Sequence, residues 1–320
     1  MNFKVLGTGS YIPPRVVTND ELATMMDTSD EAVMKLVGIK ERHVSVNETT
    51  SQMGVNAAKA ALENSGVKAE DLDLILCVTM TAEYANPGIG ALIQRDIGAK
   101  CPAMDIGGVA CTGFVYLLET AASFIATGKY KKVLLVASER LSDVTDWSDR
   151  NTAIIFSDGA GAMVVSDEED NLLSSKVNTF GDDEVIVVPN KSGKSPFWEG
   201  KVEENGFIFM NGKKTYRFAI AQMSDTINEM MAECNLKDED IKWVVPHQAN
   251  IRIINEAMRK VDISDEKFKT SIERYGNNSS ACIPILIDEM NRNGELERGD
   301  KIVLVAFGGG LHSGGAILRW

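Results

Sequence analysis

A histidine stands directly after an apolar segment of this chain. Residues 243–246 read WVVP, the pattern of a buried strand that ends at a proline, and the polar run HQAN follows at once. A hydrophobic core rarely contains such a polar cluster, whereas open α/β sheets place their chemistry in the loops after the carboxyl ends of strands. His247, one of three histidines, therefore lies where a catalytic loop is expected.

Cys111 is a candidate nucleophile. It follows two glycines in DIGGVACTGFVYLLETAASFIATG (105–128), and the segment after it is apolar nearly all round, which predicts a buried helix. In the first turn of such a helix, free N–H groups and the helix dipole stabilise an anion. We therefore expect the thiol pKa to lie below its usual value of about 8.5. The alternative is a small core residue that the helix needs for packing.

Two more segments carry groups that could stabilise negative charge. In YGNNSSACIP (275–284), Asn277 and Asn278 precede a second apolar helix, where either one could also be a simple helix cap. In FGGG (307–310), glycines after a strand allow close approach, so a backbone N–H of this loop could point at an oxyanion. No GxGxxG or Lys-Ser/Thr pattern accompanies them, which argues against a nucleotide-binding loop.

The chain reads as two copies of one α/β unit. VKAEDLDLIL (67–76) matches LKDEDIKWVV (236–245), and KVLLVA (132–137) matches KIVLVA (301–306), with one and the same offset for both pairs. Strands that alternate with helices predict parallel α/β units with right-handed crossovers. DGAGAMVV (158–165) and SGGAILRW (313–320) supply the last strand of each copy. We place the boundary near SDEEDNLLSS (166–175), which gives halves of residues 1–170 and 171–320.

The same offset relates Cys111 to Ser280. If a pseudo-twofold axis relates the halves, the starts of the two corresponding helices could converge on one pocket.

Composition narrows the class of protein. The chain has 320 residues, 44% of them hydrophobic and 25% charged, as in a globular protein of about two compact units. No apolar run reaches the roughly 18 residues of a membrane helix and no signal peptide is evident, so we expect a cytoplasmic protein. The net charge of −13 argues against a nucleic-acid groove. Five scattered cysteines lack Cys-x-x-Cys spacing, which predicts reduced thiols and no metal site.

Together these motifs resemble the β-ketoacyl-acyl carrier protein synthase III family of thiolase-fold condensing enzymes. The resemblance spans almost the whole chain and rests on Cys111 and on GTGSYIPPRVVTND, DTSDE, GIKERH, DRNTAIIFSDGAGA, VPHQANIRII, YGNNSSA and AFGGG. It implies an α/β, thiolase-like fold whose two duplicated halves form a layered αβαβα arrangement. The N-terminal half would carry the nucleophilic cysteine, and the C-terminal half the histidine and asparagine.

The resemblance implies a decarboxylating Claisen condensation that initiates fatty acid biosynthesis. Cys111 would take an acyl group from acetyl-CoA or another short acyl-CoA. His247 and Asn277 would assist loss of CO2 from malonyl-acyl carrier protein by donating hydrogen bonds to the enolate. Backbone N–H groups of Cys111 and Gly309 would hold the tetrahedral oxyanion, and the product would be a 3-oxoacyl-acyl carrier protein.

The family also implies partners. The acidic acyl carrier protein would dock on Arg217, Arg252, Arg259 and Lys260; residues 252, 259 and 260 recur on one face of a predicted helix, which could also be a simply solvated face. Arg150 would bind coenzyme A, and Leu141 and Asn86 would form the acyl pocket, with Asn86 contributed across a homodimer interface. No resident cofactor or metal is implied.

Some positions depart from the family pattern. Ala32 and Leu36 replace the usual Trp and Arg of the coenzyme A site, which favours a weaker nucleotide contact or an acyl donor linked to a carrier protein. His312 and Ser313 stand where Thr and Trp are frequent, and we expect His312 to support the site rather than to take part in the chemistry.

Three other classes of protein fit some of these residues. A papain-like hydrolase shares the Cys-His-Asn order, but the Cys-Gly-Ser-Cys-Trp flank and the scaffold are missing. A thiolase-fold acyltransferase could pass the acyl group to an alcohol or amine, although His247 and Asn277 together favour condensation. A non-enzymatic subunit of a synthase complex would have no reason to keep Cys111.

Overall fold

The computed structural model describes residues 2–189, 197 and 206–320. Two central sheets organise them. The first has the strand order β1-β7-β6-β4-β5, and the second has the order β11-β12-β13-β8. The first sheet consists of β1 (Lys4–Tyr11), β4 (Leu74–Val78), β5 (Ala103–Ile106), β6 (Lys132–Arg140) and β7 (Asp158–Ser166). The second consists of β8 (Leu172–Asp182), β11 (Trp243–Pro246), β12 (Lys301–Gly308) and β13 (Gly310–Arg319).

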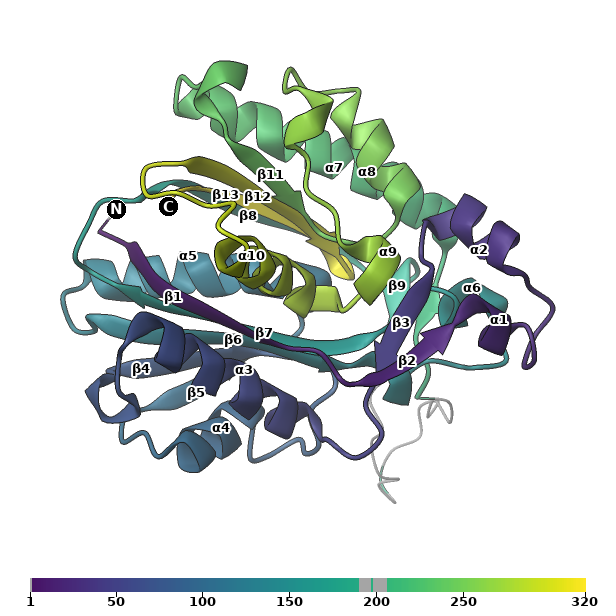
Figure 1. The fold of residues 1–320 in the computed structure, drawn as a ribbon, viewed down its shortest axis with the longest axis horizontal. Coiled ribbons are helices and arrows are strands. Elements are labelled where there is room, and N and C mark those ends of the chain that lie inside the picture. Colours follow the sequence, from purple (N-terminus) through teal and green to yellow (C-terminus); the bar gives the residue numbers. More distant parts are fainter. Residues whose placement is uncertain (1, 190–196, 198–205) are drawn as a thin grey trace.

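Helices cover the outer faces of both sheets and fill the space between them (Figure 1). Two buried helices, α5 (Gly113–Ala126) and α10 (Cys282–Arg292), form the middle layer. The first sheet is covered by α3 (Thr50–Ser65) and α4 (Ile89–Ile97), and the second by α7 (Gly212–Glu233) and α8 (Ile251–Met258). This is the layered αβαβα arrangement that the sequence predicted.

The two halves match element by element. The 3₁₀ turn η1 (Ala69–Asp71) corresponds to η4 (Asp238–Asp240), and η2 (Ala110–Thr112) corresponds to η6 (Ser279–Ala281), both at the offset found in the sequence. Their strands follow at the same interval, because β4 corresponds to β11 and β6 corresponds to β12. The proposed boundary at residue 170 lies in the connection between β7 and β8.

The sheets are mixed rather than wholly parallel. Strands β4, β5 and β6 pair in parallel, as do β11 and β12, but β7 and β13 run antiparallel to their neighbours. Strand β12 ends at Gly308 and β13 begins at Gly310, and so short a turn can join only antiparallel strands. The parallel pairing that the sequence predicted holds for β4, β5 and β6 and for β11 and β12, whereas the last strand of each half is antiparallel to its neighbours.

A smaller layer of elements lies over the end of the sheets where β6 and β12 finish (Figure 1). A separate hydrophobic cluster, which includes Leu22, Val33, Ile39, Leu141 and Ile155, holds this layer together. Its elements are β2 (Arg15–Thr18), α1 (Asn19–Leu22), α2 (Asp30–Val37), β3 (Glu41–Val44), η3 (Leu141–Asp143), α6 (Arg150–Ala153), β9 (Ile186–Val187), β10 (Phe209–Met210) and α9 (Ile272–Tyr275). A further 3₁₀ turn, η5 (Asp265–Lys267), packs near β11.

Helix ends in this layer follow from their sequences. Helix α2 begins after Ser29, whose hydroxyl accepts from the N–H of Ala32, and it ends at Gly38 with φ 76°. A glycine is needed there because a left-handed C-cap strains other residues. Among the described residues, no helix is both long and apolar enough to cross a bilayer, and no cluster of His, Cys, Asp or Glu is suited to a metal ion.

Candidate active site

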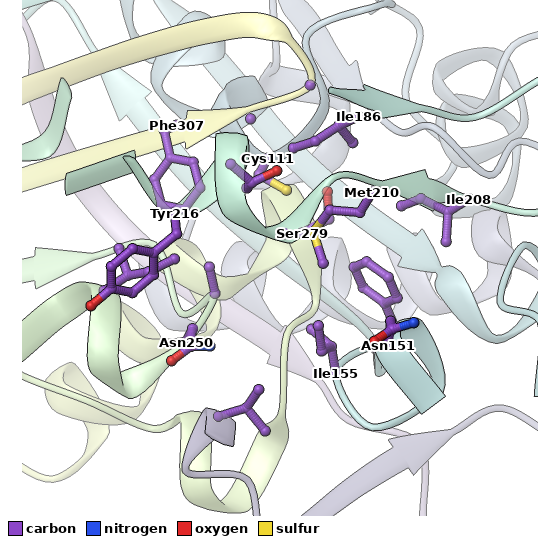
Figure 2. Close-up of a pocket in the computed structure, with 18 of the residues that line it drawn as sticks. Cys111, Asn151, Ile155, Ile186, Ile208, Met210, Tyr216, Asn250, Ser279 and Phe307 are labelled. Atoms are coloured by element: carbon purple, nitrogen blue, oxygen red, sulfur yellow. The ribbon is translucent and has the colours of Figure 1, made fainter. Parts of the chain in front are cut away.

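A cavity of about 530 Å³ opens beside Cys111 (Figure 2). Its walls come from both halves of the chain and from the smaller layer. Apolar side chains such as Ile155, Ile186, Ile208 and Met210 line one part, and Phe307, Ser279 and Cys111 line another. A mostly apolar cavity with a thiol in its wall can hold an acyl chain next to a nucleophile.

Cys111 sits in η2, the 3₁₀ turn that precedes α5, and not in the first turn of the α-helix as expected. The residue before it, Ala110, has φ 42°, a conformation that is strained for any residue with a Cβ. The end of β12 reaches the nucleophile closely: a Cβ at Gly308 would lie 2.8 Å from the backbone nitrogen of Cys111. Only glycine permits this approach.

The thiol pKa contradicts the sequence-based expectation. Burial raises the pKa of Cys111 to about 12, a hydrogen bond with the Ser279 side chain opposes this, and the Glu139 carboxylate adds to the rise. Loss of hydration disfavours the thiolate more than one turn of backbone N–H groups favours it. Cys111 is therefore a neutral thiol in the resting protein, and it needs a base before it can act as a nucleophile.

The Glu139 carboxylate is itself buried at the end of β6. Its Oε1 accepts from the Ser280 hydroxyl at 2.6 Å, and its Oε2 accepts from the Met80 N–H at 3.0 Å. Burial raises the pKa of Glu139 to about 7, while these hydrogen bonds limit the rise. Glu139 thus joins η6 to the loop after β4, close to the nucleophile.

His247 follows β11 as predicted and is buried. Its backbone N–H donates to Val305 O at 2.8 Å, and the neighbouring Gln248 side chain braces the loop through hydrogen bonds to Pro246 O and from the Ser271 N–H. The Nδ1 atom is buried and has no hydrogen-bond partner among the described residues. Burial lowers the pKa of His247 to about 3, so the imidazole is neutral.

Asn277 is buried and anchored through one side of its amide. Its Oδ1 accepts from the Ser279 N–H at 2.8 Å, which leaves the NH2 group as a free donor within the described residues. Asn278 is the N-cap of η6 but makes no capping bond, since its Nδ2 donates to Asp158 O at 2.9 Å. The simple capping alternative thus fails for Asn278, and Asn277 holds the backbone next to it.

Two cavity-lining residues connect the three candidates. The ring of Phe307 contacts the ring of His247 edge-on, with 5.4 Å between their centroids. Ser279 bonds to Asn277 through its backbone N–H and to Cys111 through its side chain. Gly309 also lines the cavity. His247 and Asn277 therefore lie immediately behind the wall in which the thiol stands.

Four exposed cationic side chains are among the residues that line the cavity. Arg150, Arg217 and Arg252 line it, together with Lys213, which the sequence analysis did not single out. Arg150 donates to Asp27 O at 3.2 Å, and the Arg252 guanidinium lies 5.9 Å from the ring centre of Tyr216. These cationic side chains can bind an anionic group in the cavity.

Arg259 and Lys260 lie at the carboxyl end of helix α8. Helix α8 ends at Met258, Arg259 is its C-cap, and Lys260 lies in the following turn. Arg259 keeps a right-handed helical conformation with φ −65°, and the bond from Lys260 N to Ala257 O tightens the turn after it. Neither lines the cavity, and the exposed Arg259 pairs with Glu256 at 2.5 Å.

The remaining predicted residues of the coenzyme A site and acyl pocket differ in how close they lie to the cavity. Leu36 lines the cavity and is 41% exposed, while Ala32 lies one turn earlier in α2 and is not part of the wall. Asn86 is exposed and does not line the cavity within this chain. Leu141 is fully buried in the cluster that backs the apolar wall.

Ser279 and Glu139 are functional candidates that the sequence motifs did not single out, whereas Gly308 belongs to the predicted FGGG segment. The repeat would have found Ser279, because the offset between the two halves places it opposite Ala110. Nothing in the local sequence marks Glu139, whose partners come from distant segments.

Comparisons with known proteins agree with this geometry. Residues 104–181 match the family model of 3-oxoacyl-[acyl-carrier-protein] synthase III, and residues 231–320 match the model of its C-terminal part. β-Ketoacyl-[acyl-carrier-protein] synthase III of Clostridium acetobutylicum is 42% identical over 99% of this chain and 98% of its own. The Oceanobacillus iheyensis protein of the same name is 43% identical over 100% of this chain and 99% of its own.

Solved structures give the same result. The crystal structure of 3-oxoacyl-[acyl-carrier-protein] synthase III from Aquifex aeolicus is 39% identical, with a TM-score of 0.92 over 99% of this chain and 100% of the other. The Thermus thermophilus enzyme is 34% identical, with a TM-score of 0.92 over 99% and 98%. The fold and the cysteine-centred site define a thiolase-fold condensing enzyme. Within that class, the chain belongs to the β-ketoacyl-acyl carrier protein synthase III family.

Proposed function

We propose that this protein catalyses the decarboxylating Claisen condensation of a short acyl thioester with malonyl-acyl carrier protein, the step that initiates fatty acid biosynthesis. The observation that carries this proposal is a thiol in the wall of an apolar cavity, with a buried neutral imidazole and a buried free amide donor behind that wall.

The first step is transfer of the acyl group to Cys111. The thiol is neutral, and so is the imidazole of His247, which can accept the thiol proton as the sulfur attacks the thioester carbonyl. The oxyanion that forms is held by the backbone N–H groups of Cys111 and Gly309. The carbonyl re-forms, the donor thiolate leaves, and the proton passes from the imidazolium to that thiolate.

The second step forms the carbon–carbon bond. Neutral His247 and the NH2 group of Asn277 donate hydrogen bonds to the thioester oxygen of the malonyl group, which stabilises the enolate left by loss of CO2. Because neither donor carries a formal charge or an acidic proton, the carbanion is not quenched. It attacks the acyl-Cys111 carbonyl, and collapse of that tetrahedral intermediate releases the Cys111 thiolate and a 3-oxoacyl-acyl carrier protein.

The exposed cationic residues that line the cavity support the proposed partners. Arg217 and Arg252, supported by Arg259 and Lys260, would attract the acidic acyl carrier protein, and Arg150 would contact a phosphate of coenzyme A. With Ala32 and Leu36 in α2, a carrier-linked acyl donor is the alternative to acyl-CoA. We further propose a cytoplasmic homodimer in which Asn86 of each subunit approaches the acyl pocket of the other, with Leu141 behind that pocket.

The test incubates the protein with malonyl-acyl carrier protein and a panel of acyl-CoA and acyl-carrier donors, and follows products by mass spectrometry. A 3-oxoacyl product that requires Cys111 is expected, and Cys111→Ala should reduce its rate to background. Acyl transfer to an alcohol or amine without loss of CO2 would contradict the proposal.

A further inference from the structure

His312 lies between the two loops that flank the nucleophile. The residue belongs to β13 and is 8% exposed. Its Nε2 is 2.9 Å from the carbonyl oxygen of Gly108, which precedes Cys111 in the same loop. Its Nδ1 is 3.0 Å from the Thr179 hydroxyl and 3.2 Å from the Tyr116 hydroxyl. Both ring nitrogens therefore have protein partners.

The His312 ring also packs against the glycine loop of its own half, at Gly310. A Cβ at Gly310 would lie 2.0 Å from Cδ2 and 2.2 Å from Nε2 of the ring, so only glycine can stand there. Gly310 adopts φ 138° and Gly108 adopts φ 75°, both in the region that favours glycine. The Cδ2–Nε2 edge of the imidazole thus abuts Gly310 at the end of the glycine loop, while its Nε2 bonds to the loop before η2.

These two loops carry the two backbone N–H groups assigned above to the oxyanion, those of Cys111 and Gly309. They belong to different halves of the chain, so continuity of one helix or strand does not fix the distance between them. On the basis of the proposed function, we propose that His312 is a positioning residue that sets the spacing of the two oxyanion donors. It touches neither substrate nor the reacting sulfur.

The hydrogen bonds define how the ring does this. A carbonyl oxygen can only accept, so Nε2 carries a proton and donates it to Gly108 O. Nδ1 accepts from one of the two hydroxyls, and the Tyr116 ring meets the imidazole edge-on with 5.6 Å between centroids. A flat ring held at both nitrogens and packed against Gly310 resists displacement better than a flexible side chain.

The experiment compares three variants by the rate of acyl transfer from an acyl thioester to Cys111, followed by intact mass before malonyl-acyl carrier protein is added. His312→Gln retains an N–H donor at the position of Nε2 and should keep most of the rate. His312→Asn places its amide near Nδ1, too far from Gly108, and should slow acylation by about 10- to 100-fold. Ser313→Ala removes the neighbouring bond to Gln222 and should leave the acylation rate nearly unchanged.

A second measurement separates positioning from general loosening. Alkylation of Cys111 by iodoacetamide forms no oxyanion, so its rate should be equal in wild type and in both His312 variants. If His312→Asn acylates as fast as wild type, or if its alkylation rate changes as much as its acylation rate, the inference is wrong. If the wild type itself forms no acyl-Cys111, the proposed function fails instead.

Discussion

Ala110 and Ser279 occupy equivalent positions in the two halves of the chain and share one rare backbone conformation, with φ 42° and 51°. Each opens a 3₁₀ turn before a buried central helix. In one half that turn presents the thiol of Cys111, and in the other it presents the Ser279 side chain to that thiol. The duplicated fold thus places two strained turns against each other, and the candidate active site lies where they meet.

Ala110→Gly should relieve the strain before the nucleophile. A left-handed conformation costs a residue with a Cβ about 1–2 kcal/mol, which exceeds the conformational cost of glycine. We expect the free energy of unfolding to rise by up to about 1 kcal/mol in denaturant titrations. Ala121→Gly, in the buried middle of α5, is the matched control and should lower it by about 1 kcal/mol or more. If Ala110→Gly and Ala121→Gly lower the free energy of unfolding equally, the backbone at Ala110 is not strained.

The reactivity of Cys111 should keep rising with pH well above neutrality. Since the folded pKa is about 12, the thiolate fraction grows about tenfold per pH unit up to the limit of protein stability. The measurement is the rate of iodoacetamide labelling at Cys111 between about pH 6 and pH 10, with Cys111→Ala to identify the labelled site. A plateau near neutral pH would instead indicate a thiolate–imidazolium pair.

Asn277→Asp should impair condensation while preserving the fold. The aspartate keeps an oxygen for the Ser279 N–H, but it replaces the NH2 donor with an acceptor that repels the enolate. We expect decarboxylation of malonyl-acyl carrier protein to slow by about 100-fold or more, with acylation of Cys111 slowed far less. His247→Ala should slow both steps, because His247 is assigned a role in each. If Asn277→Asp slows acylation and decarboxylation to the same extent, Asn277 does not have the specific role in decarboxylation proposed for it.

Glu139 should make stability depend on pH. Its carboxyl pKa is about 7 in the folded protein against an ordinary value of 4.5, so the folded state holds the proton more firmly than the unfolded chain does. The resulting stabilisation is complete below pH 4.5 and is lost as the pH rises through about 7. Glu139→Gln should flatten this dependence in thermal unfolding. It should also lower the Cys111 pKa and speed labelling at mildly alkaline pH, because the neighbouring carboxylate is gone.

Charge reversal at the exposed arginines that line the cavity should selectively weaken binding of the carrier protein substrate. Arg217→Glu and Arg252→Glu should each raise KM for malonyl-acyl carrier protein by about 10-fold at low salt, and the effect should shrink as salt screens it. Arg259→Glu should cost less, since Arg259 is already paired with Glu256. Lys68→Glu, in an exposed position before the amino end of β4, is the control. If Arg252→Glu leaves KM for malonyl-acyl carrier protein unchanged, Arg252 is not part of the docking surface.

Much of this architecture can be predicted from the sequence because its signals are local or periodic. The strands repeated at a constant offset, the apolar helix after Cys111 and the loop at His247 all depend on burial patterns that the chain repeats. The grouping of Cys111, His247 and Asn277 into one site followed from their motifs, and the structure brings their surroundings together around one cavity.

Tertiary structure decided the properties that depend on neighbours distant in sequence. The position of Cys111 before a helix predicts a low thiol pKa. Burial between the two halves and the carboxylate of Glu139 instead raise the pKa of Cys111 to about 12. His312 contacts Gly108 only because β13 packs against η2 from the other half of the chain. Local sequence determines which elements form and which side chains they carry. Desolvation and hydrogen-bond geometry depend on what surrounds those side chains, and only the folded chain supplies that.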